Sequence, residues 1–305
     1  MAKKSIWAIA GGKGGVGKSF LCSNLSIDLA QKGNSVVLID ADFGGPNLHT
    51  FLGISTSIIS VSDFIKNSQL RLDDILLPTG IPNLKLASGA QDVLGMANLN
   101  IIQQNKLIKA IASLNVDYVL IDLGAGTTAY TLDLFLSADK GILVTASEPT
   151  SVENTYRFVK SAFYRKLKTV VRHAGVKSFL ERITDSKNEE NPRTPADLVT
   201  EIYDINMQAG ETLKYELAKF NPKLVLNQVR TPTDVRIGFS MSQACKKYFG
   251  VDVGYVGFVE HDSTVIQSIR QRRPVVITSP NSNAANSISK IAQNIRQDYH
   301  LVNSN

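Results

Sequence analysis

Cysteine is scarce in this chain. The 305 residues include two cysteines, Cys22 and Cys245, which lie far apart and form no C-x-x-C pair. This scarcity excludes a disulfide framework and favours a reducing compartment. We expect both thiols to be packing residues rather than ligands. No metal-site spacing relates the four histidines, which are His49, His173, His261 and His300.

Long apolar runs are also missing. No segment reaches 18 continuous apolar residues, so the sequence predicts no membrane-spanning helix. The apolar run after Met1–Lys4 resembles the start of a signal peptide, but it stops at Gly11. Internal repeats and low-complexity tails are absent. With 43% hydrophobic residues the chain can build a sizeable core, and we interpret residues 1–305 as one globular domain of cytoplasmic location.

The charge balance is mildly basic. The net charge is +6 and the isoelectric point is near 9.2. Such a balance permits contact with anionic lipid or nucleic acid, but it is more typical of an ordinary solvated surface.

A complete G-x-x-x-x-G-K-[ST] phosphate loop occupies residues 12–19. It follows the apolar run 6–10 and precedes a helical pattern, which is the strand, loop and helix context that this motif requires. Glycines let backbone N–H groups surround an anion, and the helix N-terminus points at the same place. We predict that Lys18 reaches the β- and γ-phosphates and that Ser19 ligates Mg²⁺. The expected nucleotide contacts are Gly12, Lys13, Gly14, Gly15, Val16, Gly17, Lys18, Ser19 and Phe20.

The remaining apolar runs predict the fold class. Core strands are expected at 36–39, 116–122, 141–145 and 224–227, with further strands at 84–87, 255–258 and 274–277. Helical spacing predicts helices at 61–65, 70–77 and 101–114 and a terminal helix that packs through residues 285–295. This alternation indicates an α/β fold, namely a doubly wound, mostly parallel sheet with helices on both faces, as in P-loop NTPases.

Residues 165–215 break the alternation of strands and helices. They contain a basic stretch at 165–168, a polar run at 185–192 and a helix-like segment at 195–208. We interpret this region as an insertion within the single domain, with the polar run as an exposed loop.

Three aspartates follow predicted strands. Asp122 ends one strand, where we expect it to hold Mg²⁺ through its water shell. Asp40 and Asp42 end another and, being two residues apart, point the same way. Phosphoryl transfer to water needs a metal ion, an oriented water and positive charge near the phosphates. Lys18 is the candidate for the positive charge, and these carboxylates are the candidates for holding the metal ion and the water. The alternative for each aspartate is a helix N-cap or turn residue.

The loop also contains a lysine one residue after Gly12. The pattern K-G-G-x-G-K-[ST] at 13–19 resembles the deviant Walker A signature of the MinD/ParA family of ATPases. The resemblance implies that Lys13 reaches across a dimer interface to the nucleotide of the other subunit, and hence that ATP binding produces a sandwich dimer. The alternative is a solvated loop lysine.

The switch segments extend the resemblance. Asp40-Ala41-Asp42, followed by Pro46-Asn47, is similar to switch I of the family. This similarity implies that Asp42 orients the attacking water while Asp40 supports Mg²⁺ and Ser19. D-x-G-A-G at 122–126 is similar to switch II of the flagellar-number regulators FlhG, FleN and YlxH, where backbone N–H groups sense the γ-phosphate.

Base recognition is expected at the end of a late strand. No N-K-x-D guanine motif is present there, and the sequence reads L-N-Q-V-R at 226–230. The resemblance implies that Asn227 contacts adenine and that Arg230 lies at the nucleotide, although a turn-forming asparagine is the alternative. It also places 260–262 near the base, with Glu260 where the family usually has proline.

The resemblance implies a slow, partner-stimulated ATPase that is a homodimer with ATP and controls flagellar number or placement. Division-site placement is the nearest alternative. Its partners would be an FlhF-like GTPase or another positioning protein, with peripheral contact at the inner face of the membrane. The tail after Ile295 lacks the amphipathic membrane-targeting pattern of many members.

Two other functions stay open. One is a ParA-type partition or cargo-positioning ATPase that binds DNA nonspecifically through Lys246, Lys247, Arg270, Arg272 and Arg273. The other is an iron–sulfur carrier like Mrp or the nitrogenase iron protein, which the positions of Cys22 and Cys245 disfavour.

Overall fold

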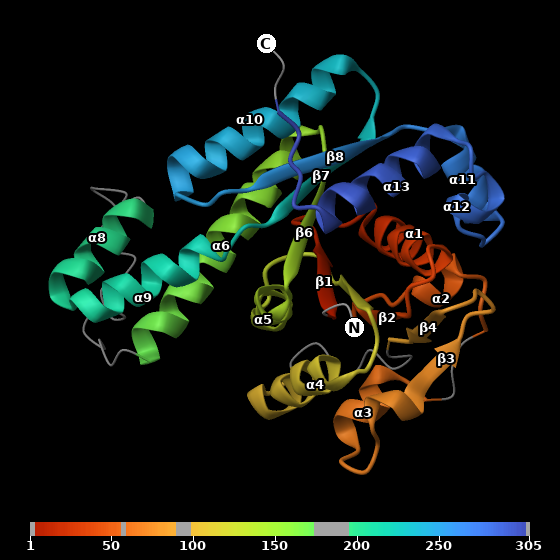
Figure 1. Ribbon diagram of the computed structural model, residues 1–305, viewed down its shortest axis with the longest axis horizontal. Helices are drawn as coiled ribbons and strands as arrows, with labels where there is room; N and C mark the ends of the chain where they lie inside the picture. Colours follow the sequence, from red (N-terminus) through yellow and green to blue (C-terminus); the bar gives the residue numbers. More distant parts are fainter. Residues whose placement is uncertain (1–3, 56–58, 90–98, 174–194, 303–305) are drawn as a thin grey trace.

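A single sheet forms the centre of the molecule in the computed structural model, which describes residues 4–55, 59–89, 99–173 and 195–302 (Figure 1). Its eight strands run in the order β3-β4-β2-β5-β1-β6-β7-β8. Only β3 and β4 pair antiparallel, and every other neighbouring pair is parallel. The strands are β1 Ser5–Ala10, β2 Val36–Ala41, β3 Leu76–Pro78, β4 Leu84–Ala87, β5 Tyr118–Leu123, β6 Lys140–Ala146, β7 Lys223–Val229 and β8 Gly254–Glu260.

Helices cover both faces of this sheet. One face carries α1 Lys18–Gln31, α2 Leu48–Phe51, α12 Val275–Thr278 and α13 Asn283–Arg296. The other carries α3 Val61–Lys66, α4 Ile101–Ser113, α5 Ala129–Ser137, α6 Pro149–His173 and α10 Pro232–Phe249. Farther from the sheet, α9 Met207–Ala218 packs against α6, and α8 Pro195–Ile205 packs against α9. The short η1 Leu72–Ile75 precedes β3, and α11 Ser263–Arg270 follows β8. The doubly wound, mostly parallel α/β fold is confirmed.

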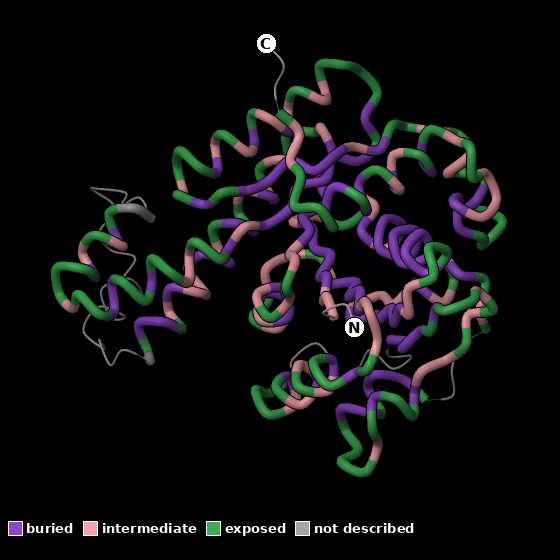
Figure 2. Tube along the Cα trace, in the orientation of Figure 1, coloured by how far each residue is buried: buried purple, intermediate pink, exposed green. Residues whose placement is uncertain are grey.

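Burial follows this layering. Successive β1 residues alternate between the two cores, since Ala8 packs on one face while Trp7 and Ile9 pack on the other. The central strands and α1 are buried along most of their length (Figure 2). A parallel sheet covered on both faces needs such continuous apolar runs, and this is why the core strands were readable in the sequence.

Two predicted elements are wrong in type. The expected strand 274–277 is the short helix α12, which begins after Pro274 and packs its valines against the core around α1. The expected helix 70–77 is the 3₁₀ turn η1 followed by the antiparallel edge strand β3. Short apolar runs carry too few residues for periodicity to separate strand from helix.

The region predicted as an insertion is helical where it is described. Residues 165–173 form the last part of α6. The helix-like segment 195–208 is not one helix, because α8 ends at Ile205 and the side chain of Asn206 caps α9 by accepting a hydrogen bond from the N–H of Ala209. The ion pair between Lys166 and Glu216 joins α6 to α9. The polar run 185–192 lies outside the described residues, and the insertion stays a prediction.

Candidate functional site

The candidate site lies at the carboxyl ends of three adjacent strands. The phosphate loop follows β1, Asp42 follows β2, and Asp122 lies in the last part of β5. In the register, Asp122 is paired with Ile9 of β1 on one side and with Asp40 of β2 on the other. The structure therefore brings together the loop and the three carboxylates that the sequence singled out.

Glycines shape the phosphate loop where the backbone requires them. Gly15 and Gly17 have φ angles of 80° and 96°, in the left-handed region that favours glycine. Gly17 is the N-cap of α1, so the phosphate loop leads directly into the N-terminus of this helix. Lys18 is the first residue of α1, and it is 7% exposed. Free N–H groups and a lysine at a helix N-terminus form an anion-binding cradle.

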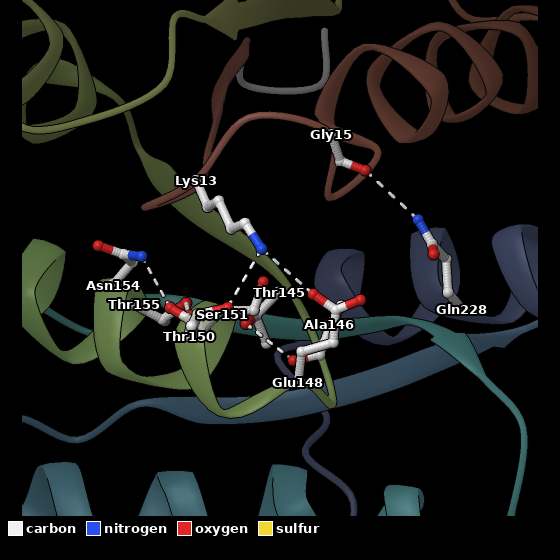
Figure 3. A network of polar contacts seen from close by, with 10 residues as sticks. All are labelled: Lys13, Gly15, Thr145, Ala146, Glu148, Thr150, Ser151, Asn154, Thr155 and Gln228. Atoms are coloured by element: carbon white, nitrogen blue, oxygen red, sulfur yellow. Dashed lines mark hydrogen bonds and ion pairs between the residues drawn. The ribbon is translucent and has the colours of Figure 1, made fainter.

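Two side chains from β7 hold the loop in place. Nδ2 of Asn227 donates to the carbonyl oxygen of Val16 at 2.8 Å. Nε2 of Gln228 donates to the carbonyl oxygen of Gly15 at 3.3 Å, as Figure 3 shows. A β-carbon at Gly17 would lie 2.1 Å from the Asn227 amide. Gln228 was not singled out in the sequence, which contains no local signal for this contact. Contact of Asn227 with adenine stays a prediction.

The other predicted contacts belong to α1 and to the ends of β7 and β8. Phe20 belongs to α1, is 5% exposed and packs into the core between this helix and the sheet. Arg230 is exposed, and its backbone N–H donates to the carboxylate of Asp234 at 2.9 Å. At the end of β8, Glu260 accepts a hydrogen bond from Asn283. The role of 260–262 near a base stays a prediction.

Asp122 is the least satisfied polar group of the site. It is 1% exposed, and neither carboxylate oxygen has a well-formed hydrogen bond among the described residues, although the Ser19 hydroxyl lies near enough to lower its pKa. Burial raises the pKa of Asp122 to about 7, while nearby Ser19 and Lys18 act in the opposite direction. A buried acceptor without a well-formed hydrogen bond beside a hydroxyl and a lysine is chemically suited to a hydrated cation.

Asp40 is fully buried beside Asp122. Its carboxylate accepts hydrogen bonds from the N–H groups of Asp42 at 3.2 Å and Leu48 at 3.1 Å. Burial raises the pKa of Asp40 to about 8, and the charge of Asp122 contributes to this rise. Two buried carboxylates that disfavour each other's ionisation are stabilised together by a divalent cation.

The donor set fits magnesium rather than a closed protein cage. In the part of the chain that the structure describes, no three His, Cys, Asp or Glu side chains gather as a metal cage. Mg²⁺ usually keeps several waters and takes one or two carboxylates plus substrate phosphates. Ser19, Asp40 and Asp122 are therefore the residues that would hold it, with charge neutralisation at the phosphates as its contribution.

The two switch segments contact each other at Asp42. Its Oδ1 accepts a hydrogen bond from the N–H of Gly44 at 3.2 Å and lies 3.1 Å from where a β-carbon of Gly124 would be. The N–H of Gly126 donates to the carbonyl oxygen of Gly11 at 3.4 Å. Switch I, switch II and the phosphate loop thus form one continuous surface.

Lys13 is held by residues that follow β6. Its Nζ lies 3.3 Å from Oε2 of Glu148 and 3.1 Å from Oγ1 of Thr150 (Figure 3). The lysine side chain is 42% exposed and the glutamate 63%, so this ion pair contributes at most about 1 kcal/mol. Neither partner could be found from the sequence, because they lie 135 and 137 residues from Lys13.

Known structures share this fold. The septum site-determining protein MinD of Pyrococcus horikoshii, complexed with Mg-ADP, has a TM-score of 0.64 and 22% identity and covers 96% of both chains. A ParA family ATPase from Chlorobium tepidum has a TM-score of 0.64 and 17% identity, covering 95% of this chain and 99% of its own. Within the described ranges, no helix has the length and apolar content needed to cross a membrane.

Sequence relatives give the family. The antiactivator FleN of Pseudomonas aeruginosa is 26% identical over 295 residues, or 95% of this chain and 85% of FleN. MinD of a Synechocystis species is 34% identical over 155 residues, or 50% of this chain and 58% of that protein. The family model described as ParA, NUBPL iron-transfer P-loop NTPase, matches residues 2–176. Because this model covers more than half of the chain, including the phosphate loop and the strand-end carboxylates, this chain belongs to the ParA/MinD family of P-loop NTPases.

Proposed function

We propose that this protein is an ATP-hydrolysing molecular switch that forms an ATP-sandwich dimer and controls flagellar number and placement. The observation that carries the proposal is the extent of the match to FleN, which spans 95% of the chain, whereas the MinD match spans half. Division-site placement as in MinD is the nearest alternative within the family.

The site residues divide the chemistry among them. Lys18 and the loop N–H groups bind the phosphates, and Asp42 orients the attacking water. Ser19, Asp40 and Asp122 are suited to hold Mg²⁺, which neutralises charge on the phosphates when bound. Asn227 and Arg230 would contact the nucleotide on its adenine side.

Dimerisation depends on Lys13. Its exposed contacts with Glu148 and Thr150 are weak enough to exchange for a nucleotide in the partner subunit. The γ-phosphate controls whether such switch segments are ordered. Turnover is therefore slow until a partner orders the switch segments fully. The expected partners are an FlhF-like GTPase or another positioning protein, in the cytoplasm or peripherally at the inner face of the membrane.

Affinity capture from native lysate tests the proposal. The bait is Asp42→Ala, which should retain ATP and accumulate the dimer, and the control is Lys18→Ala, which should not bind nucleotide. Recovery of an FlhF-like GTPase or flagellar basal-body proteins by the bait alone is the expected result. Recovery of division-site proteins instead would replace the flagellar role with septum placement.

A ParA-type role on DNA is the second candidate. Lys246 and Lys247 are exposed in the last turn of α10, and Arg270, Arg272 and Arg273 are exposed at and after the end of α11. Phosphate contacts release counterions, so such binding weakens steeply with salt. Retention of the ATP-bound dimer on DNA at low salt and its loss at higher salt would favour this role, and no retention at low salt would remove it.

A further inference from the structure

Tyr130 places a buried, unpaired hydroxyl beside the candidate site. No residue in the described ranges accepts or donates a hydrogen bond at this hydroxyl, although the oxygen is shielded from solvent. Tyr130 lies in the first turn of α5, four residues after Gly126 of switch II. A buried polar group without a partner costs free energy, and a hydrogen-bond partner in the nucleotide-bound state would recover that cost.

The surroundings of Tyr130 indicate what that partner is. Its ring stacks on Phe43 with the centroids 5.2 Å apart and the planes 30° from parallel, and Phe43 directly follows Asp42. Burial raises the pKa of Tyr130 well above its ordinary value, and the charges of Asp40 and Asp42 raise it further. The phenol therefore keeps its proton and is a donor close to two carboxylates.

Of the two carboxylates, Asp42 is the less engaged. Each oxygen of Asp40 already accepts one backbone N–H group, from Asp42 and Leu48, and these bonds hold Asp40 in place. Asp42 accepts from Gly44 through Oδ1, and its other oxygen receives no hydrogen bond from any described residue. Phe43, which directly follows Asp42, is also the ring on which Tyr130 stacks, so the hydroxyl and this carboxylate belong to segments that already touch.

We propose that Tyr130 is a positioning residue of the hydrolytic site: when Mg²⁺ and nucleotide are bound, its hydroxyl donates a hydrogen bond to Asp42. This bond fixes the carboxylate that orients the attacking water. The packing of Tyr130 on Phe43 couples α5, which follows switch II, to switch I. Ordering of one switch segment therefore orders the other. The inference rests on the proposed ATPase function and assigns the donor that holds its water-orienting residue.

Tyr130→Phe tests the inference, with Tyr255→Phe as the matched control. Tyr255 also has a buried hydroxyl without a partner among the described residues, but its ring packs at 5.0 Å against Phe239 and its pKa is raised by burial alone. Each substitution removes one hydroxyl and keeps the ring. In urea unfolding without nucleotide, both variants should be at least as stable as the parent protein.

The expected result is a split between binding and turnover. Tyr130→Phe should keep KM for Mg·ATP and the affinity for a fluorescent ATP analogue within twofold, while kcat falls about tenfold, the size expected for one lost hydrogen bond. Tyr255→Phe should leave all three unchanged. Thus only Tyr130 should affect the step after binding.

Three outcomes would overturn the inference. If the parent hydrolyses ATP and Tyr130→Phe matches its kcat, the hydroxyl has no role and the proposed function stands. If affinity and kcat/KM fall by the same factor with kcat unchanged, Tyr130 is a binding residue and not a positioning one. If the parent shows no Mg²⁺-dependent ATP hydrolysis, the proposed function and this inference fail together.

Discussion

Replacement of Asp122 by asparagine should stabilise the protein when nucleotide and metal are absent. Asp122 is 1% exposed, and its oxygens have no well-formed hydrogen bond among the residues that the structure describes. Its ionised form therefore destabilises the native state until a cation is bound. Asparagine has nearly the same shape and removes the charge.

The pKa of Asp122 sets the size and pH dependence of this effect. The rise from the ordinary value of 3.8 to about 7 corresponds to about 4 kcal/mol, at about 1.36 kcal/mol per pKa unit. The attraction of Ser19 and Lys18 is already contained in this value. A buried asparagine amide without its full set of partners costs part of the gain, so we expect a net gain of about 2 to 4 kcal/mol at pH 8. Because the folded-state pKa is the higher one, the native state holds the extra proton between about pH 4 and 7. The stability of the parent should fall across this range, and the advantage of the variant should grow.

Urea unfolding in the presence of EDTA measures this prediction at pH 5 and pH 8. The Asp122→Asn variant should exceed the parent more at pH 8 than at pH 5, and added Mg²⁺ and ATP should reverse the order, since only the parent keeps the carboxylate. Asp117→Asn is the control of opposite sign, because hydrogen bonds from Ser35 lower the pKa of Asp117 and removal of that carboxylate should weaken the protein at pH 8. A variant that is less stable than the parent at pH 8 without metal would refute the reasoning.

Two further predictions concern the phosphate loop. A β-carbon at Gly12 would lie 2.2 Å from the carbonyl oxygen of Asn154, so Gly12→Ala should displace the loop, cost about 1 to 3 kcal/mol and weaken binding of a fluorescent ATP analogue at least tenfold. Gly45→Ala is the control, because the nearest atom to its β-carbon would be Nδ2 of Asn47 at an ordinary 3.9 Å, and equal affinities of the two variants would contradict the prediction. Lys13→Ala should bind ATP but stay monomeric in light scattering, whereas Glu148→Gln should still dimerise. If Lys13→Ala still forms a dimer with ATP, Lys13 is a solvated loop residue without a role in dimerisation.

The sequence predicted those site residues that lie close to the end of a strand. The phosphate loop, Asp42 and Asp122 each follow an apolar run, and parallel strands must end at the same edge of a sheet. The same reasoning was wrong at 274–277, where Pro274 starts a short helix instead of a strand. A buried apolar segment of four residues fits either structure, so its packing partners decide the outcome.

The sequence by itself therefore determined the fold class, the family motifs and the residues that meet at the site, because local spacing and strand order specify these. The tertiary structure decided which of those groups lack partners and which distant residues hold them. Asn227 donates to Val16 across 211 residues, and the ring of Tyr130 packs on Phe43. Such contacts depend on how whole elements pack, and no local pattern encodes them. The same packing excludes water from Asp122 and raises its pKa, and this is the physical basis for the magnesium site proposed there.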